Sequence, residues 1–174
     1  MKKNIILFII FITLFTGCNL NEEKNTLAKC EVFDCINKIE PENSVEEINE
    51  IMGFNGVVTD EKYKIYYWEL SDDDGIQVAY YSSDKSQIKL KYDRDVLENK
   101  KVNLTKLEEL KEDLKKGVKI TYDDLTKYFK TNGTLVGKSS IYKKYTWVDE
   151  DGNYSTATID NKTNRCTLLT GKID

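Results

Sequence analysis

Two stretches of the chain follow the same plan: SVEEINEIMGFNGVVTDEKYKIYYW at residues 44–68 and TYDDLTKYFKTNGTLVGKSSIYKKYTW at residues 121–147. Each begins with a hydroxyl residue, continues with apolar residues at helical spacing, reaches an Asn-Gly pair and ends in an aromatic run closed by tryptophan. Matching residues are 75 to 79 positions apart throughout. Because repeated supersecondary units leave repeated sequence patterns, the chain is predicted to contain an internal repeat.

Helix starts and ends can be placed around these stretches. Both begin with the spacing of a capping box, in which a hydroxyl and a carboxylate satisfy free backbone amides at a helix start, in Ser44-x-x-Glu47 and Thr121-x-x-Asp124. Each box therefore predicts a short helix. A longer helix is predicted over residues 104–116, because leucines recur on one face and Gly117 can end it in a left-handed conformation. Its counterpart is expected near residues 27–39.

After each helix pair the apolar period changes from 3.6 to 2, which is typical of strands. Strands are predicted near residues 56–60, 62–71, 75–82, 86–93, 133–138, 140–149, 153–160 and 164–170. If each acidic turn is a three-residue hairpin loop, the pairs directly opposite each other are Trp68 with Val78, Tyr66 with Tyr80, and Trp147 with Ser155. This register places both tryptophans in the core.

The sequence therefore predicts an α+β protein of two tandem α-α-β-β-β-β units, with helices packed on one face of a curved antiparallel sheet. The units are residues 30–95 and 96–174. The order of capped helix, Asn-Gly pair and aromatic strand resembles the β-lactamase-inhibitory-protein-like fold, whose topology is shared by small single-unit assembly-factor lipoproteins of outer membranes. The resemblance covers residues 30–171 and implies a protein that binds other proteins on its open sheet face.

Residues 1–17 have the composition of an export signal. Lys2 and Lys3 precede eleven almost wholly apolar residues, 5–15, too few for the ~20 that a membrane-spanning helix needs. The run Leu14-Phe15-Thr16-Gly17-Cys18 that follows resembles the lipobox of bacterial lipoproteins. It implies cleavage before Cys18, lipid such as palmitate on that residue, and a polar tether over residues 18–29.

Composition narrows the function further. The chain has no histidine, which removes histidine-dependent nucleophiles, general bases and metal ligands. Lysine outnumbers arginine 24 to 2, as expected of an AT-rich, Gram-positive bacterium, and residues 18–174 carry 24 basic against 30 acidic side chains, a net charge of −6. With only two arginines and an acidic balance, nucleic acid is not an expected partner.

The same strand register leaves an excess of apolar and aromatic side chains on the open face of the predicted sheet. Tyrosines are favoured at the cores of protein interfaces, so these residues form the predicted binding face. Its members are Ile65, Tyr67, Tyr81, Tyr142, Val148 and Tyr154, with Ala79, Thr156 and Leu169 on the same side. A slip of one residue would exchange the two faces.

Three cysteines remain beyond Cys18. Cys30 and Cys35 are close enough in sequence to form a disulfide, whereas Cys166 is expected to be buried as a small hydrophobic residue. An anaerobic source would leave all three reduced. Asp149-x-Asp151-x-Asn153 partly matches a calcium loop, but it has Tyr154 where the loop needs glycine and it is flanked by strands. An acidic hairpin turn explains it better, so we predict no metal site.

These observations predict a non-enzymatic, membrane-anchored lipoprotein on the outer side of a cell membrane, with no catalytic residues and no cofactor. It would hold an extracytoplasmic protein on the open sheet face. Two alternatives stay open. One is a cell-wall lipoprotein that binds carbohydrate on its tyrosines or hydrolyses it with a carboxylate pair. The other is a structural lipoprotein of envelope assembly.

Overall fold

The computed structural model describes residues 31–72, 74–82, 85–92, 97 and 102–173. The predicted signal peptide, the tether, Cys18 and Cys30 lie outside the described residues. No helix within these ranges is long and apolar enough to span a membrane.

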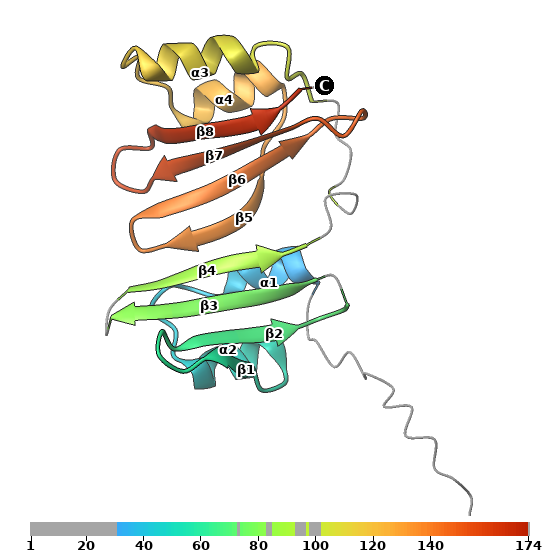
Figure 1. The fold of residues 1–174 in the computed structure, drawn as a ribbon, viewed down its shortest axis with the longest axis vertical. Coiled ribbons are helices and arrows are strands. Elements are labelled where there is room, and N and C mark those ends of the chain that lie inside the picture. The colour runs from blue at the N-terminus through green and yellow to red at the C-terminus, as the bar shows by residue number, and fades with distance from the viewer. Residues whose placement is uncertain (1–30, 73, 83–84, 93–96, 98–101, 174) are drawn as a thin grey trace, which may run out of the picture.

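Within the described residues the chain forms four short helices and eight strands (Figure 1). The helices are α1 (Val32–Lys38), α2 (Val45–Met52), α3 (Leu107–Lys115) and α4 (Tyr122–Phe129). The strands are β1 (Val57–Asp60), β2 (Ile65–Glu69), β3 (Gly75–Ser82), β4 (Lys85–Lys91), β5 (Thr134–Ser139), β6 (Tyr142–Val148), β7 (Tyr154–Asp160) and β8 (Cys166–Lys172). Each strand overlaps a predicted one.

The predicted α+β assembly of two tandem α-α-β-β-β-β units with helices packed on one sheet face is wrong. The described residues form one continuous antiparallel sheet in the order β1 to β8, which Figure 1 shows as a single ladder, and most of the ordered structure is strand. The halves are not self-contained units, because α1 of the first half contacts β5 of the second as well as β3 and β4. Local periodicity predicts individual elements but carries no information on how two halves join.

The junction between the halves is the pairing of β4 with β5. Ile88 lies opposite Lys138, and Lys89 lies opposite Gly137. The Lys138 ammonium group, whose side chain is 5% exposed, lies 3.2 Å from the carboxylate of Glu40, just beyond the end of α1. The chain after α1 is thus fixed to the first strand of the second half.

Two hydrophobic clusters combine helix and strand residues, one in each half of the chain. Both predicted core tryptophans are confirmed: Trp68 is fully buried in the first cluster and Trp147 is 2% exposed in the second. Each indole passes directly over the glycine of an Asn-Gly pair. A methyl group on Gly56 would lie 2.4 Å from the Trp68 ring, and one on Gly133 would lie 2.7 Å from the Trp147 ring.

Both predicted capping boxes are confirmed. The Ser44 hydroxyl accepts from the Glu47 amide while the Glu47 carboxylate accepts from the Ser44 amide, and Thr121 and Asp124 repeat the exchange. These hydrogen bonds hold the pKa of Glu47, like that of Asp124, below its usual range. Gly117, with φ of +83°, follows α3 as predicted.

The first hairpin differs from its predicted register. Trp68 lies opposite Ile76 and Tyr66 opposite Val78, so the predicted partners Val78 and Tyr80 are each displaced by two residues. An even displacement leaves every side chain on its predicted face.

The cause is a turn that closes one residue earlier than predicted. The Leu70 amide donates to the Asp74 carbonyl at 2.9 Å, and the Asp74 amide donates to the Ser71 hydroxyl at 3.1 Å. Serine side chains stabilise turns in this way. The second hairpin keeps its predicted register, with Trp147 opposite Ser155.

One side chain links α2 to its sheet. The Asn49 side-chain oxygen accepts from the Trp68 indole N–H and from the Gly56 amide, both at 2.9 Å. In the second half the Trp147 indole donates instead to the Thr131 carbonyl. The indole of Trp68 is therefore hydrogen-bonded to a side chain, and the indole of Trp147 to the backbone.

We expect Asn49→Ala to lower the free energy of unfolding by about 2 kcal/mol, because two partly buried donors lose their acceptor. Thr126→Ala is the matched control. Thr126 is the fifth residue of α4, as Asn49 is of α2, and its hydroxyl donates only to the Asp123 carbonyl. It should cost less than about 0.5 kcal/mol. Urea unfolding followed by tryptophan fluorescence measures both; equal losses would contradict the assignment.

Candidate functional site

Strand residues alternate between the two hydrophobic clusters and the opposite side of the sheet, which we call the open face. Cross-strand pairing builds a continuous row of residues along this face, through all eight strands. From β1 to β8 the row is Val57, Tyr67, Gln77, Lys89, Gly137, Lys144, Thr158 and Leu168. The open face is therefore one surface shared by both halves of the chain.

The six residues of the predicted binding face fall in separate parts of the sheet. Ile65 and Tyr67 lie in β2, whereas Val148 and Tyr154 form a direct cross-strand pair between β6 and β7. Strands β2 and β6 are four positions apart in the sheet, about 19 Å. Tyr142 lies at the other end of β6 from Val148, and the side chain of Tyr81 in β3 lies outside the described part of the structure. The structure thus places five of the six, in two pairs and a separate tyrosine.

Tyr67 lies against the sheet. A methyl group on Gly75 would sit 2.3 Å from the Tyr67 hydroxyl oxygen and 2.5 Å from its ring. Glycine in β3 therefore provides the space into which the tyrosine leans, and the ring shields an otherwise bare piece of backbone.

Val148 is buried beside Leu97, a described residue between β4 and α3. It is 6% exposed and lines a small cavity of about 10 Å³ together with Leu97, which is 3% exposed, and Thr146. The Tyr92 hydroxyl also reaches Thr146, at 3.5 Å. This corner of the open face is occupied by the chain itself.

Leu169 does not lie on the open face, contrary to prediction. It is 7% exposed and belongs to the second hydrophobic cluster. The pairing of β7 with β8 shifts between Thr158 and Ile159, where a β-bulge lets Ile159 face Cys166 while Thr158 faces Leu168. One extra residue exchanges the two sides of a strand, so Leu168, 53% exposed, takes the predicted place of Leu169.

The described charges of the open face are nearly balanced, with a slight basic excess. Four lysines and three acids occupy it: Lys89, Lys91, Lys144, Lys172, Asp60, Glu69 and Asp160. Asp160 is engaged by the turn after β7, since its carboxylate accepts from the Thr163 hydroxyl at 2.7 Å, and this hydrogen bond lowers its pKa. Helices α2, α3 and α4, by contrast, carry three, four and two acidic residues against three lysines in total. The open face thus differs in charge from the helices.

Strand alternation alone places Lys89 on the side of β4 away from the core, and Lys144 on the same side of β6 as Tyr142, but it gives neither lysine a role. What alternation does not show is the pairing of β4 with β5, which brings Lys89 and Lys144 to either side of Gly137.

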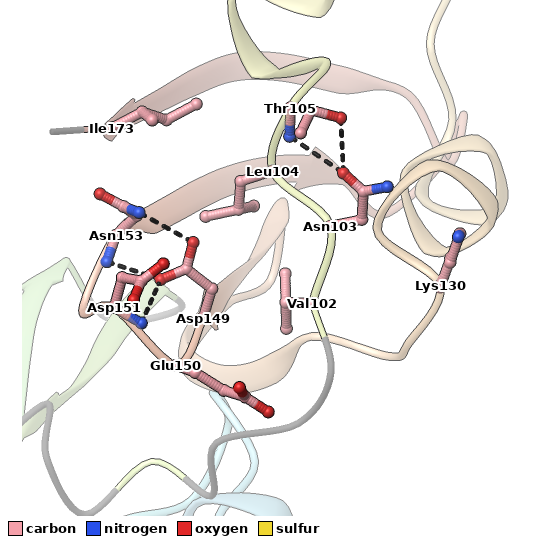
Figure 2. A pocket seen from close by; sticks show the side chains of 10 residues that line it. All are labelled: Val102, Asn103, Leu104, Thr105, Lys130, Asp149, Glu150, Asp151, Asn153 and Ile173. Atoms are coloured by element: carbon pink, nitrogen blue, oxygen red, sulfur yellow. Dashed lines mark hydrogen bonds between the residues drawn. The ribbon is translucent and has the colours of Figure 1, made fainter.

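A second concavity, of about 680 Å³, lies at the end of the second half (Figure 2). Its walls are residues 102–105, the turn at residues 149–153, Lys130 after α4, and Ile173. Figure 2 shows the Lys130 and Glu150 side chains extending away from each other. The cavity therefore does not bring these opposite charges together around a common point.

The acidic turn beside this cavity contains the calcium-like pattern. The Asp149 carboxylate accepts from the Asp151 and Asn153 amides at 3.0 and 2.9 Å and from the Asn153 side chain at 2.9 Å. Gly152 has φ of +80°. These contacts form a hairpin turn that uses the carboxylate internally, and within the described ranges no group of three or more potential ligands is placed to hold a metal ion.

The cysteines differ in state. Cys35 is fully buried and disulfide-bonded, while its predicted partner Cys30 lies outside the described residues. Cys166 is a free thiol in the second cluster, as predicted. Burial raises its pKa to about 11, and its Sγ donates to the Leu168 carbonyl.

Comparisons of the chain with protein-family models, with curated proteins and with solved structures give no match.

We expect Cys166 to react with iodoacetamide at pH 8 about a hundredfold more slowly in the folded protein than in urea. The thiolate is the reactive form, and a pKa raised from about 9 to about 11 lowers its fraction by that factor. Peptide mass spectrometry measures the rates. Without reductant, Cys35 should react in neither state because it is disulfide-bonded. Equal rates for Cys166 in both states would contradict its burial.

Proposed function

We propose that this protein is a non-enzymatic lipoprotein, anchored on the extracytoplasmic side of the membrane, that binds a protein partner on the open face. The observation that carries the proposal is the row of residues that runs across all eight strands without interruption. A protein partner needs a broad surface of this kind, whereas a small-molecule site needs an enclosed pocket with convergent polar groups.

The arrangement of polar groups supports binding over catalysis. The chain has no histidine, and the Asp149 carboxylate beside the larger cavity serves a turn. A glycosidase would need two carboxyl groups facing each other across a sugar. Three carboxylates line that cavity, all from one turn: Asp149 lies in a closed hydrogen-bond network, Glu150 extends outward (Figure 2), and Asp151 is two residues from Asp149.

Carbohydrate binding through stacked tyrosines is less well supported. Stacking needs the flat side of an aromatic ring to be open. Tyr67 leans onto Gly75, and Val148 beside Tyr154 is covered by Leu97. The open face therefore offers a mixed polar, basic and apolar surface, which suits a protein interface better than a sugar platform.

The membrane anchor rests on the lipobox-like residues ending in Cys18. An anchor of several acyl chains holds a protein on a bilayer far more firmly than one chain. The polar tether predicted over residues 18–29 would join this anchor to the folded part of the chain.

The binding face is tested by photo-crosslinking in living cells. A photoreactive amino acid at Thr158, on the open face, should give a discrete protein adduct, and one at the exposed Glu109 of α3 should give little. Adduct mass on denaturing gels is the measurement. Adducts from the Glu109 position alone would show that the open face is not the binding site. A glycan adduct from the Thr158 position would favour the carbohydrate alternative.

The anchor is tested by Cys18→Ala. We expect the protein to leave the membrane fraction or to persist as an unprocessed precursor, because lipid attachment and cleavage both need the cysteine. Incorporation of labelled palmitate and fractionation of cells measure this. Ser44→Ala, which alters only a helix cap, is the control and should leave lipidation unchanged. Normal labelling of the Cys18 variant would contradict the proposed anchor.

A further inference from the structure

We propose that the partner of the open face is a protein that places a carboxylate group between Lys89 and Lys144, above Gly137. The inference rests on the proposed function and specifies the chemistry of the partner. It is drawn from the pairing at the junction of the halves, from the charges that lack a partner within the described chain, and from the extent of the face.

The two lysines flank a glycine. Lys89 in β4 and Lys144 in β6 each lie directly opposite Gly137 in β5. Their Cα atoms are thus two strand spacings apart, about 10 Å. Gly137 places no side chain of its own between the two lysine stems. An acidic group seated there would meet both ammonium groups.

Neither lysine has a charged partner within the described part of the chain. Their remaining cross-strand neighbours are Gln77 for Lys89 and Thr158 for Lys144, both uncharged. Lys91 is different, because its ammonium group donates to the Asp72 carbonyl at 3.1 Å and so belongs to the turn after β2. Lys138, on the opposite side of the same strands, has Glu40. Lys89 and Lys144 are therefore available to bind an acidic group of another molecule.

The central position of these lysines makes the acid necessary. They lie in the fourth and sixth of eight strands, so a protein that covers the whole open face also covers them. Burying an ammonium group without an opposite charge is strongly unfavourable, whereas a buried, hydrogen-bonded carboxylate compensates it. Complementary charge at such a point selects the partner and speeds association.

The size of the face favours a protein over a membrane surface. Eight strands of about seven residues span roughly 34 Å by 23 Å, on the order of 800 Å² before the corner covered by Leu97 is removed. That is close to one partner's share of a standard protein interface. Recognition of anionic lipid uses clusters of about four to eight basic residues, and here Asp60, Glu69 and Asp160 stand among the four lysines of the open face.

The test uses the Thr158 photo-crosslinker in the full-length lipoprotein in cells. In Lys89→Gln/Lys144→Gln the adduct yield should fall about tenfold, the scale of losing one close charge pair. Lys89→Arg/Lys144→Arg should keep the yield, because charge is retained. Lys119→Gln/Lys127→Gln is the matched control, since it removes two exposed lysines away from the open face and should also keep the yield. Thermal unfolding checks that all variants fold.

Each other outcome overturns the inference. An unchanged yield in the glutamine pair would show that no acid binds there, while the open face would remain the binding site. Equal loss in the arginine pair would show that the lysines act by packing, and equal loss in the control pair would show a general effect of net charge. Lipid adducts in place of protein would identify the membrane as occupant. If the Thr158 crosslinker gives no adduct even in the protein that keeps Lys89 and Lys144, the proposed function itself is wrong.

Discussion

The pairing of β4 with β5 is the interaction on which the rest of the structure depends. It converts two four-stranded segments into one sheet, and it needs Gly137, because a side chain there would crowd the Ile88 carbonyl oxygen at 3.1 Å. The same strands are held on their other side by the Lys138–Glu40 ion pair. A buried ammonium group that lost its carboxylate would be strongly destabilising, so this pair favours one way of joining the halves over others. Both the cluster side and the open face are continuous because of this junction.

How much of this could be predicted from the sequence follows from the range of each interaction. The capping boxes at Ser44 and Thr121 involve residues three apart, and the periods of helices and strands are local as well, so these features were predictable. The burial of Trp68 and Trp147 followed from strand alternation. The pairing of β4 with β5 was not predictable, because it joins residues some fifty positions apart and the two strands carry no complementary pattern. Two tandem units on a shared curved sheet were therefore predicted, without the contact of α1 with β5 that makes the halves interdependent.

Errors of register had unequal consequences for the site. The first hairpin was misplaced by two residues, which kept Tyr67 on the open face. The bulge opposite Ile159 displaced β8 by one residue and moved Leu169 into the core. Nor could the sequence show that Leu97 would cover Val148, because that contact comes from a connection without periodicity. Aromatic content drew attention to tyrosines that partly pack on the sheet, while the lysines at its centre were visible only once the halves were joined.

The lysines at the centre of the open face also disfavour self-association of the protein. A broad sheet face with exposed apolar residues such as Val57 and Leu168 is a risk for self-association. A second copy docking face to face would bring Lys89 and Lys144 against the same lysines, a like-charge contact that costs affinity. An acidic protein meets no such penalty. The charges that disfavour a second copy are therefore the same ones that favour an acidic partner, so one pair of residues supplies both attraction and exclusion.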